Sequence, residues 1–413
     1  MTRRTIRGAV LLALLPAAAY GQSFEAVDTL PYPSTSVFPA YPGEPEGPRA
    51  FFAQLGMLYD NNILRRPAGV RDELVTRLGL GVRQDVRVVG RQTLRLEARG
   101  DIMLYQQFGD LDHIAYGALA EWRWEAGNQL AGTLGLRRRQ FQADLSETQA
   151  AVHDLITENR LYGTGAYRFA PDWRVRGGLD LTSAERPRRA DVETRGSSAT
   201  GGIDYVTPLG NALGLEVRVT RGDAPVPEEL VVTPGTFVDN DFKEREVAAV
   251  AVYNPGPTLR TAGRIGQTRR EYTQLPGRDF SGGTGSFSVE WLPGNKTILG
   301  FEAYKRVSSI LDVAASHIVT KGVSFGPSWA ATAKLVFTAR LVNEDRDFEG
   351  DPNAVAGAPL RSDSVRTVRL GAGWEITRQV QLGFALERGA RDSNILGRDY
   401  QYTAAMANAR YNF

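Results

Sequence analysis

The sequence predicts an all-β fold: a transmembrane, antiparallel, up-and-down β-barrel of about eighteen strands, with about sixteen as the fallback. Apolar and polar residues alternate with a period of two in run after run from residue 50 onward, as in strands with one apolar face. Very short turns alternate with longer polar loops between these runs. The last alternating run ends on an aromatic residue, Phe413.

The first residues have the composition of an export signal. Three arginines within the first seven residues precede an apolar run at 9–15, and small residues follow it. A basic, then apolar, then small-residue order is typical of a secretory signal peptide. We therefore expect residues 1–21 to be a signal peptide, too short in its apolar part to remain as a membrane anchor.

Residues 22–49 form a proline-rich segment that we expect in the periplasm. Six prolines fall within it, and proline cannot donate a hydrogen bond to a strand ladder. The segment is therefore predicted to be extended and unpaired. It could be a flexible tether, a docking peptide for a periplasmic export component, or a segment that folds into the pore.

From residue 50 the alternation is regular enough to mark individual strands of one barrel domain, 50–413. In one such run Leu213, Leu215 and Val217 interleave with Glu216 and Arg218. The same reading along the chain gives the following expected strands: 50–60, 73–86, 92–106, 112–125, 128–142, 157–169, 172–184, 194–207, 210–221, 242–254, 257–271, 281–292, 295–308, 315–326, 330–343, 364–377, 379–389 and 399–413.

Two kinds of connection join these strands. The short ones are rich in Pro, Gly, Asn and Asp, which suit tight turns; residues 208–211 and 326–328 are examples. The others are longer and polar, such as 224–241 and 343–364. Short turns at one end and long loops at the other are the construction of outer-membrane barrels.

Strand length and aromatic position favour a membrane barrel over a soluble sandwich. The expected strands have about 11–14 residues, whereas about 9–11 cross a bilayer at a tilt and about five or six form a typical soluble strand. Trp122, Trp173, Trp291 and Trp374 stand beside short turns, as in an interfacial aromatic girdle. We therefore expect outer-membrane lipids around the apolar face and a location in the bacterial outer membrane.

The last run carries a candidate assembly signal. Phe413, Tyr411 and Ala409 share one face of the expected terminal strand. A terminal aromatic preceded by apolar residues at every second position resembles the tag by which outer-membrane proteins are recognised. Tyr411 and Phe413 are the candidates, and the barrel-assembly machinery is the expected partner.

Composition and motifs point away from enzymes and nucleic-acid binding. The net charge is +2 and there is no cysteine, so neither a basic binding surface nor a disulfide is implied. His113 and His153 have aspartate neighbours, but adjacent residues of an extended chain point to opposite sides. Residues 345–350 begin like a calcium loop, yet Ala356 stands where the EF-hand pattern needs Glu. We expect no enzyme and no cofactor, while a looser cation site in this loop remains open.

The charged residues are expected in the wall of the barrel. Arginine at the lipid midplane costs about 2–4 kcal/mol, so the charged face must line the lumen. We expect most carboxylates to pair one to one with arginines, leaving a positive excess that favours anions or acidic sugars. The lumen-lining candidates are Arg77, Arg95, Arg99, Arg123, Arg137, Arg139, Arg174, Arg176, Arg218, Arg340, Arg369, Glu97, Glu121, Glu216, Glu290 and Glu302.

A short motif after the first strand carries a family resemblance. The run from Tyr59 to Ile63 reads Tyr-Asp-Asn-Asn-Ile, and it resembles EpsL-like outer-membrane barrels of exopolysaccharide operons, in the family called Putative beta-barrel porin 2. The resemblance implies a barrel linked to polysaccharide export and supplies no catalytic residues. From the residues alone, Asp60, Asn61 and Asn62 would form a loop whose side chains bond their own backbone.

Three functions are compatible with these sequence features. The leading hypothesis is a porin-like barrel that passes anionic or neutral saccharides, or small solutes, by diffusion. The second is an outer-membrane enzyme with an active site at the rim. The third is a structural barrel whose lumen is plugged, for example by the loop 224–241.

Overall fold

The computed structural model describes residues 49–189, 193–224, 226–229, 234–274, 276–309, 317–350 and 359–413. The expected signal peptide, 1–21, and the proline-rich segment as far as residue 48 lie outside the described residues. Arg49, the last residue assigned to that segment, is the first residue of the first strand.

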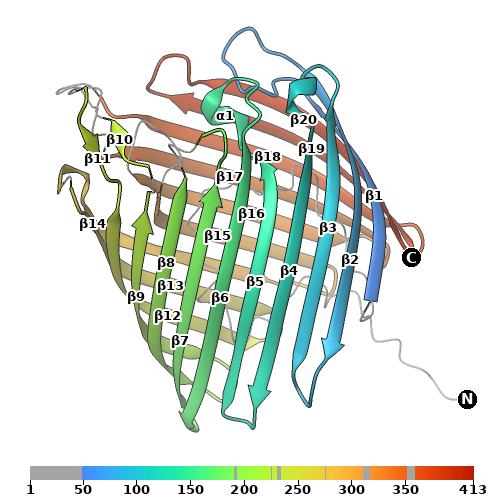
Figure 1. Ribbon diagram of the computed structural model, residues 1–413. Helices are drawn as coiled ribbons and strands as arrows, with labels where there is room; N and C mark the ends of the chain where they lie inside the picture. Colours follow the sequence, from blue (N-terminus) through green and yellow to red (C-terminus); the bar gives the residue numbers. More distant parts are fainter. Residues whose placement is uncertain are drawn as a thin grey trace, which may run out of the picture.

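Eighteen long strands form one closed sheet around a central lumen (Figure 1). Each strand pairs antiparallel with its neighbours along the chain, and the last strand pairs with the first. The predicted up-and-down barrel is therefore confirmed. Its strands are β1 (Arg49–Asp60), β2 (Glu73–Arg87), β3 (Thr93–Tyr105), β4 (His113–Ala126), β5 (Leu130–Gln142), β6 (Leu155–Ala170), β7 (Trp173–Glu185), β8 (Thr194–Val206), β9 (Ala212–Asp223), β12 (Phe242–Gly256), β13 (Leu259–Tyr272), β14 (Phe280–Trp291), β15 (Thr297–Ser309), β16 (His317–Ala330), β17 (Leu335–Glu349), β18 (Ser362–Glu375), β19 (Val380–Ser393) and β20 (Tyr400–Asn412).

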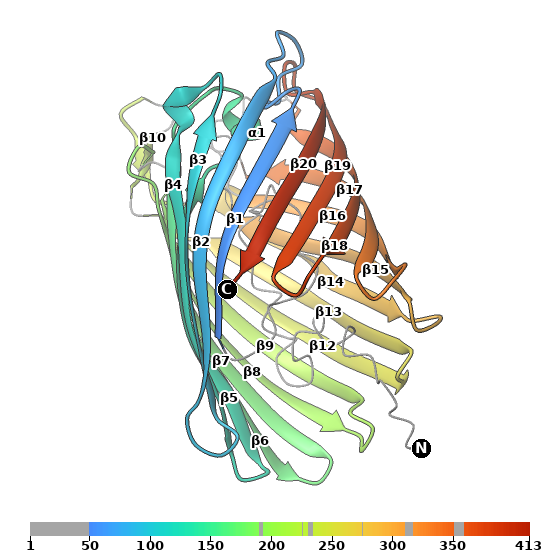
Figure 2. The same ribbon diagram turned by 90° about the vertical axis from the view of Figure 1, so that its right-hand side faces the viewer.

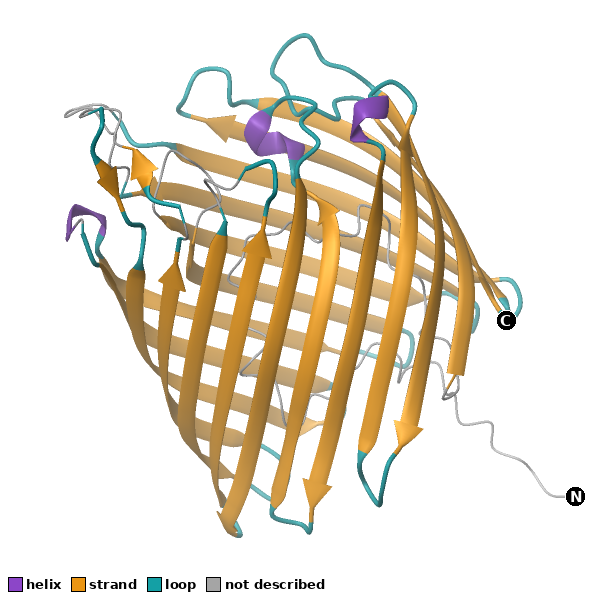
Figure 3. Cartoon of the chain, in the orientation of Figure 1, coloured by secondary structure: helices purple, strands orange, loops and turns teal. Residues whose placement is uncertain are grey.

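The remaining elements are short and belong to the long loops (Figure 3). The expected loop 224–241 contains a small hairpin of two strands. At the start of the short helix α1 (Leu145–Thr148), Asp144 accepts a hydrogen bond from the backbone N–H of Ser146 at 2.9 Å and is the N-cap. The short elements are β10 (Glu228–Glu229), β11 (Phe237–Val238), α1 (Leu145–Thr148) and the 3₁₀ turns η3 (Gly109–Leu111) and η5 (Pro276–Arg278). Among the described residues no helix has the length and apolar character to cross a membrane.

The predicted turn at 326–328 is wrong. These residues lie inside β16, where Pro327 pairs in register with Leu299 of β15. On the other side, the ladder to β17 is interrupted between Phe325 and Ser328, because proline has no N–H to donate. A turn-like composition therefore marks a gap in one ladder, and the chain reverses after Ala330.

The predicted loop at 343–364 is also wrong at both ends. β17 continues to Glu349 and β18 begins at Ser362. The strand extension was hidden because residues 343–347 are polar on both faces, so the apolar alternation stops before the ladder does. Asp345 and Asp347 consequently lie on a strand with one residue between them, so residues 345–349 are not the start of a loop.

The two faces of the wall differ sharply in exposure. On β9, Leu213 and Leu215 are 63% and 60% exposed, whereas Glu216 is fully buried. Ile265 and Leu80 are likewise highly exposed on their strands. A water-soluble protein would not present such a belt of apolar side chains, but a lipid-facing barrel exterior requires it.

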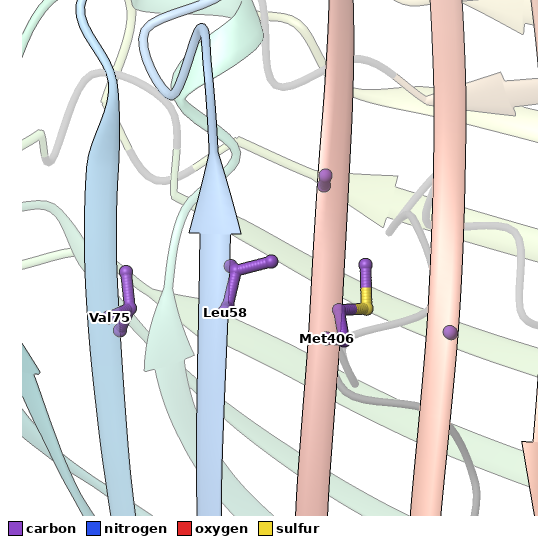
Figure 4. Packing of buried hydrophobic residues seen from close by; sticks show 5 residues of the cluster. Leu58, Val75 and Met406 are labelled. Atoms are coloured by element: carbon purple, nitrogen blue, oxygen red, sulfur yellow. The ribbon is translucent and has the colours of Figure 1, made fainter.

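The barrel closes where β1 lies beside β20 (Figure 2). Leu58 pairs in register with Met406 across this seam and with Val75 on its other side. All three side chains are buried in one apolar cluster near the long-loop end (Figure 4). The cluster joins the first, second and last strands, so the closure is stabilised by packing as well as by the ladder.

Candidate functional site

The candidate site is the inner face of the wall, which we define as the face opposite the exposed apolar residues. On β9 this face carries Glu216 and Arg218. The pairing register places every predicted wall candidate on this same face, because residues directly opposite in a ladder share a face. These are Arg77, Arg95, Arg99, Arg123, Arg137, Arg139, Arg174, Arg176, Arg218, Arg340, Arg369, Glu97, Glu121, Glu216, Glu290 and Glu302.

One sector of the inner face, from β7 to β13, is closely ion-paired. Glu216, on β9, contacts three guanidinium groups, those of Arg176, Arg218 and Arg264. The neighbouring Asp204 accepts from Arg176 at 3.1 Å and from Arg174 at 2.6 Å. The expected one-to-one pairing is therefore wrong: the strand register brings several arginines to one carboxylate, which the local sequence cannot reveal.

The same network continues onto β12 and β13. Glu246 lies 2.7 Å from Arg264 and 3.5 Å from Arg218, measured between nitrogen and oxygen. Glu244 pairs with Arg270 at 2.7 Å. Because these groups are largely buried against one another, they hold the wall together and present little free charge to a solute.

A second sector, from β2 to β6, is richer in exposed arginine. Arg77 pairs with Asp101 at 2.8 Å, and Arg137 and Arg139 share Glu158 at 3.0 and 2.7 Å. Elsewhere in this sector Arg95 pairs with Asp85 at 2.9 Å, and Arg123 with Glu121 at 2.7 Å. The arginines here outnumber the carboxylates that they share.

Arg99 is the exposed base at the centre of this second sector. It makes no hydrogen bond or ion pair with any residue that the structure describes. In register it faces Gly117 of β4, which faces Arg139 of β5. Since Gly117 has no side chain, the Arg99 side chain lies over it, 3.4 Å from the ideal Cβ position to Arg99 Nε. The glycine thus lets the Arg99 side chain extend over β4 toward Arg139 of β5.

The remaining candidates are dispersed. Arg369 pairs with Glu387 at 2.5 Å. Glu97 is 4.0 Å from Arg95, whereas Arg340, Glu290 and Glu302 form no ion pair among the described residues. Several further inner-face residues were not predicted as candidates, although the same alternation marks them: Glu158, Arg160, Asp204, Glu244, Glu246, Arg264 and Arg270.

Three long loops meet at the mouth of the barrel. Leu64, Leu111 and Leu145 form a buried apolar cluster, each from a different loop; we call it the mouth cluster. From the wall, Arg391 of β19 donates to the Ser146 carbonyl at 3.0 Å. The α1 loop, which joins β5 to β6, therefore reaches a strand beyond the β1–β20 seam and covers part of the opening (Figure 1).

The histidines do not form the His–Asp pairs that the sequence left open. The His113 ring bonds the Leu111 carbonyl, and the His153 ring bonds the Asp110 carbonyl, both at 2.8 Å. Asp154 is held by Arg186 instead. Within the described part of the chain, no three His, Asp or Glu side chains gather into a possible metal site.

Comparison with known proteins agrees with this architecture. Residues 255–413 match the family model described as "Putative beta-barrel porin 2". The barrel is closed, has an even number of strands and exposes an apolar exterior, which together indicate the bacterial outer membrane. The protein is a porin-like β-barrel of the bacterial outer membrane. No curated protein matches its sequence.

Among solved structures, the barrel is similar to outer-membrane proteins of Pseudomonas. OpdK of Pseudomonas aeruginosa is 12% identical with a TM-score of 0.48, over 88% of this chain and 99% of that one. OccK2 (OpdF) of the same species is 12% identical with a TM-score of 0.49, over 88% and 97%. A BenF-like porin of Pseudomonas fluorescens is 8% identical with a TM-score of 0.48, over 88% and 99%.

Proposed function

We propose that the barrel passes anionic or neutral saccharides and other small solutes by diffusion. The observation that carries this proposal is Arg99, an exposed inner-face base that forms no hydrogen bond or ion pair with a described residue and lies next to the arginines of β2 and β5. A base of this kind in a low-dielectric wall raises the local concentration of anions. An anion can move along the wall by pairing with one arginine after another, and this movement needs no catalytic group. Such transfer is compatible with passive diffusion.

Liposome swelling tests this proposal with three sugars of one size. Galacturonate, galactose and galactosamine differ mainly in charge at neutral pH. We expect the acid and the neutral sugar to enter faster than the amine, and Arg99→Gln to reduce the advantage of the acid over galactose. Arg91→Gln, an exposed base of a short turn that pairs with Glu125 at 3.0 Å, is the control and should leave the rates unchanged. Faster entry of galactosamine would contradict the proposal.

We further propose a link to exopolysaccharide export. Its support is the run from Tyr59 to Ile63, which resembles EpsL-like barrels. Periplasmic export components would then be partners of the barrel. Deleting the protein from its own bacterium and weighing the secreted polysaccharide tests this link. An unchanged yield and chain length would remove the polysaccharide association and leave the diffusion proposal standing.

A plugged structural barrel is the second candidate, and the mouth cluster favours it. Leu64, Leu111 and Leu145 join three loops over part of the opening, and Arg391 binds the α1 loop to β19, beyond the β1–β20 seam. If these loops close the mouth fully, the purified barrel will insert into bilayers without conducting. Recovery of conductance after deletion of the α1 loop would then identify that loop as the plug.

A further inference from the structure

The outer face carries a basic patch beside the loop 224–241, in which four bases outnumber the two outward carboxylates beside them, Asp223 and Glu271. Lys243 of β12 lies directly opposite Arg221 of β9, and Arg245 of β12 lies directly opposite Arg269 of β13. All four have the parity of the exposed apolar residues of their strands, such as Leu215 and Val247, and therefore point outward. Like charges directly opposite in a ladder destabilise it, so two such pairs side by side require an explanation.

Two carboxylates lie beside the four bases: Glu271 of β13 is directly opposite Lys243, and Asp223 lies two residues from Arg221 on the same face of β9. Arg269 pairs with Glu271 at 2.8 Å, and this pair is widely exposed. Arg221, Lys243 and Arg245 make no hydrogen bond or ion pair with any described residue. The inward-pointing arginines of the same strands do form ion pairs: Arg218 and Arg270 contact carboxylates of the wall. Among the described residues the four outward bases therefore form one ion pair, Arg269 with Glu271, and are less fully paired than their inward neighbours.

The patch begins at the height of lipid headgroups with Lys243, and Arg245 lies two residues nearer the apolar belt on the same strand. Tyr253 ends the outward row of β12 near a short turn, ten residues from Lys243. At about 3.3 Å per residue and a tilt of about 40°, these residues differ in height by about 25 Å, which is the height of the apolar band. Lys243 therefore lies just above the lipid-facing belt, at the end with the long loops, and that end faces the cell exterior.

We propose that this patch, Arg221, Lys243, Arg245 and Arg269, binds the phosphate groups of an anionic glycolipid in the outer leaflet. The lipid chains would lie along the apolar rows below, such as Leu213, Leu215 and Ile265, while the phosphates accept from the guanidinium and ammonium groups above them. This ligand would supply counter-charge beyond that of the two neighbouring carboxylates, Asp223 and Glu271. The site is separate from the inner face and does not depend on what passes through the lumen.

Binding of labelled lipopolysaccharide to the detergent-purified full barrel tests the proposal. The variant Arg221→Gln/Lys243→Gln removes one of the opposed pairs. Each base near an anionic lipid surface contributes about 1 kcal/mol, so we expect affinity to fall on the order of 30-fold. The matched control is Lys321→Gln/Arg366→Gln, two outward bases that already pair with Asp347 at 3.3 Å and Asp392 at 2.8 Å; its affinity should stay within about threefold of wild type.

Two further measurements make the result decisive. Heat-modifiable migration of each variant on a gel establishes that the barrel is folded. Lipopolysaccharide stripped of its phosphates should bind as weakly as the patch variant does to the intact lipid. The proposal is overturned if both double variants lose the same affinity, if neither loses any, or if inorganic phosphate alone displaces the label at the concentration of lipid phosphate.

Discussion

The side-chain amide of Asn62 donates a hydrogen bond of 2.9 Å to the backbone carbonyl of Gln401, a residue 339 positions further along the chain. The same amide group donates to the Arg66 carbonyl, and its oxygen accepts from the Arg66 N–H. Asn62 therefore shapes its own loop and fastens that loop to the last strand. Only the first role could be predicted from the sequence, because the second depends on closure of the barrel.

Asn62→Ala should weaken the seam between β1 and β20. Asn62 is 1% exposed, and the substitution leaves the Gln401 carbonyl and two backbone groups of Arg66 without this partner. A buried group left unsatisfied costs about 1–3 kcal/mol, so the barrel should convert to its heat-denatured form at a lower temperature. Asn295→Ala, in an exposed short turn, is the control. Equal melting of the two variants would contradict a role of Asn62 in the seam.

Glu73→Gln should loosen the loop that follows β3. The fully buried Glu73 carboxylate accepts from four backbone N–H groups, those of Leu74, Gln106, Gln107 and Phe108. An amide replaces one acceptor oxygen with a donor, so we expect a loss of about 3 kcal/mol or more. Limited proteolysis should cut near residues 106–112 in this variant. The variant Asp72→Asn, at the exposed neighbouring residue, should resist proteolysis as the wild type does. If residues 106–112 were cut equally slowly in both variants, the role of Glu73 would be refuted.

Glu216→Gln should destabilise the ion-paired sector strongly. Its carboxylate is fully buried and contacts three arginines. Breaking a buried ion pair from one side costs about 3–5 kcal/mol. By contrast, Glu125→Gln breaks an exposed pair with Arg91 and should cost no more than about 1 kcal/mol. Urea unfolding of the two variants in detergent measures the difference, and similar midpoints would show that the buried network contributes little.

Deletion of Phe413 should reduce the amount of assembled barrel. The Phe413 N–H donates to the Phe51 carbonyl at 2.9 Å, and its ring packs edge-on against Tyr411 with centroids 5.0 Å apart. The ring itself is largely exposed on the outer side of the terminus, where a recognition partner could reach it. We expect less heat-modifiable protein in the outer membrane, whereas Leu396→Ala, at a fully exposed loop position, should assemble normally. Normal assembly without Phe413 would remove the proposed signal.

The strands and their faces could be predicted from the sequence because alternation is a local signal. Leu213 to Val219 reveal which side of β9 meets lipid without any knowledge of its neighbours. The predicted strand ends are wrong where the local sequence pattern and the strand pairing differ. At Pro327 the missing N–H interrupts one ladder inside a strand, so the sequence resembles a turn. Beyond Asn343 the opposite occurs, since the ladder outlasts the apolar alternation.

The ion-pair partners in the wall could not be predicted from the sequence, because they depend on the strand register. Which carboxylate meets Arg176 depends on the register of β7, β8 and β9 together, and Glu216 is reached across an intervening strand. Face assignment gives the set of charged groups, but only the register gives their partners. Arg99 could be named as an inner-face candidate from alternation alone, whereas the absence of an ion pair between it and any described residue could not be predicted.

The reversal potential across a planar bilayer in a salt gradient tests the central claim, an inner wall that favours anions, most directly. The purified wild-type barrel should conduct with a reversal potential of the sign for anion preference, because the β2–β6 sector presents exposed arginine to the lumen. Arg99→Gln should move the potential toward zero, and Arg91→Gln should not. A reversal potential of the opposite sign, or a folded barrel without conductance, would contradict the account.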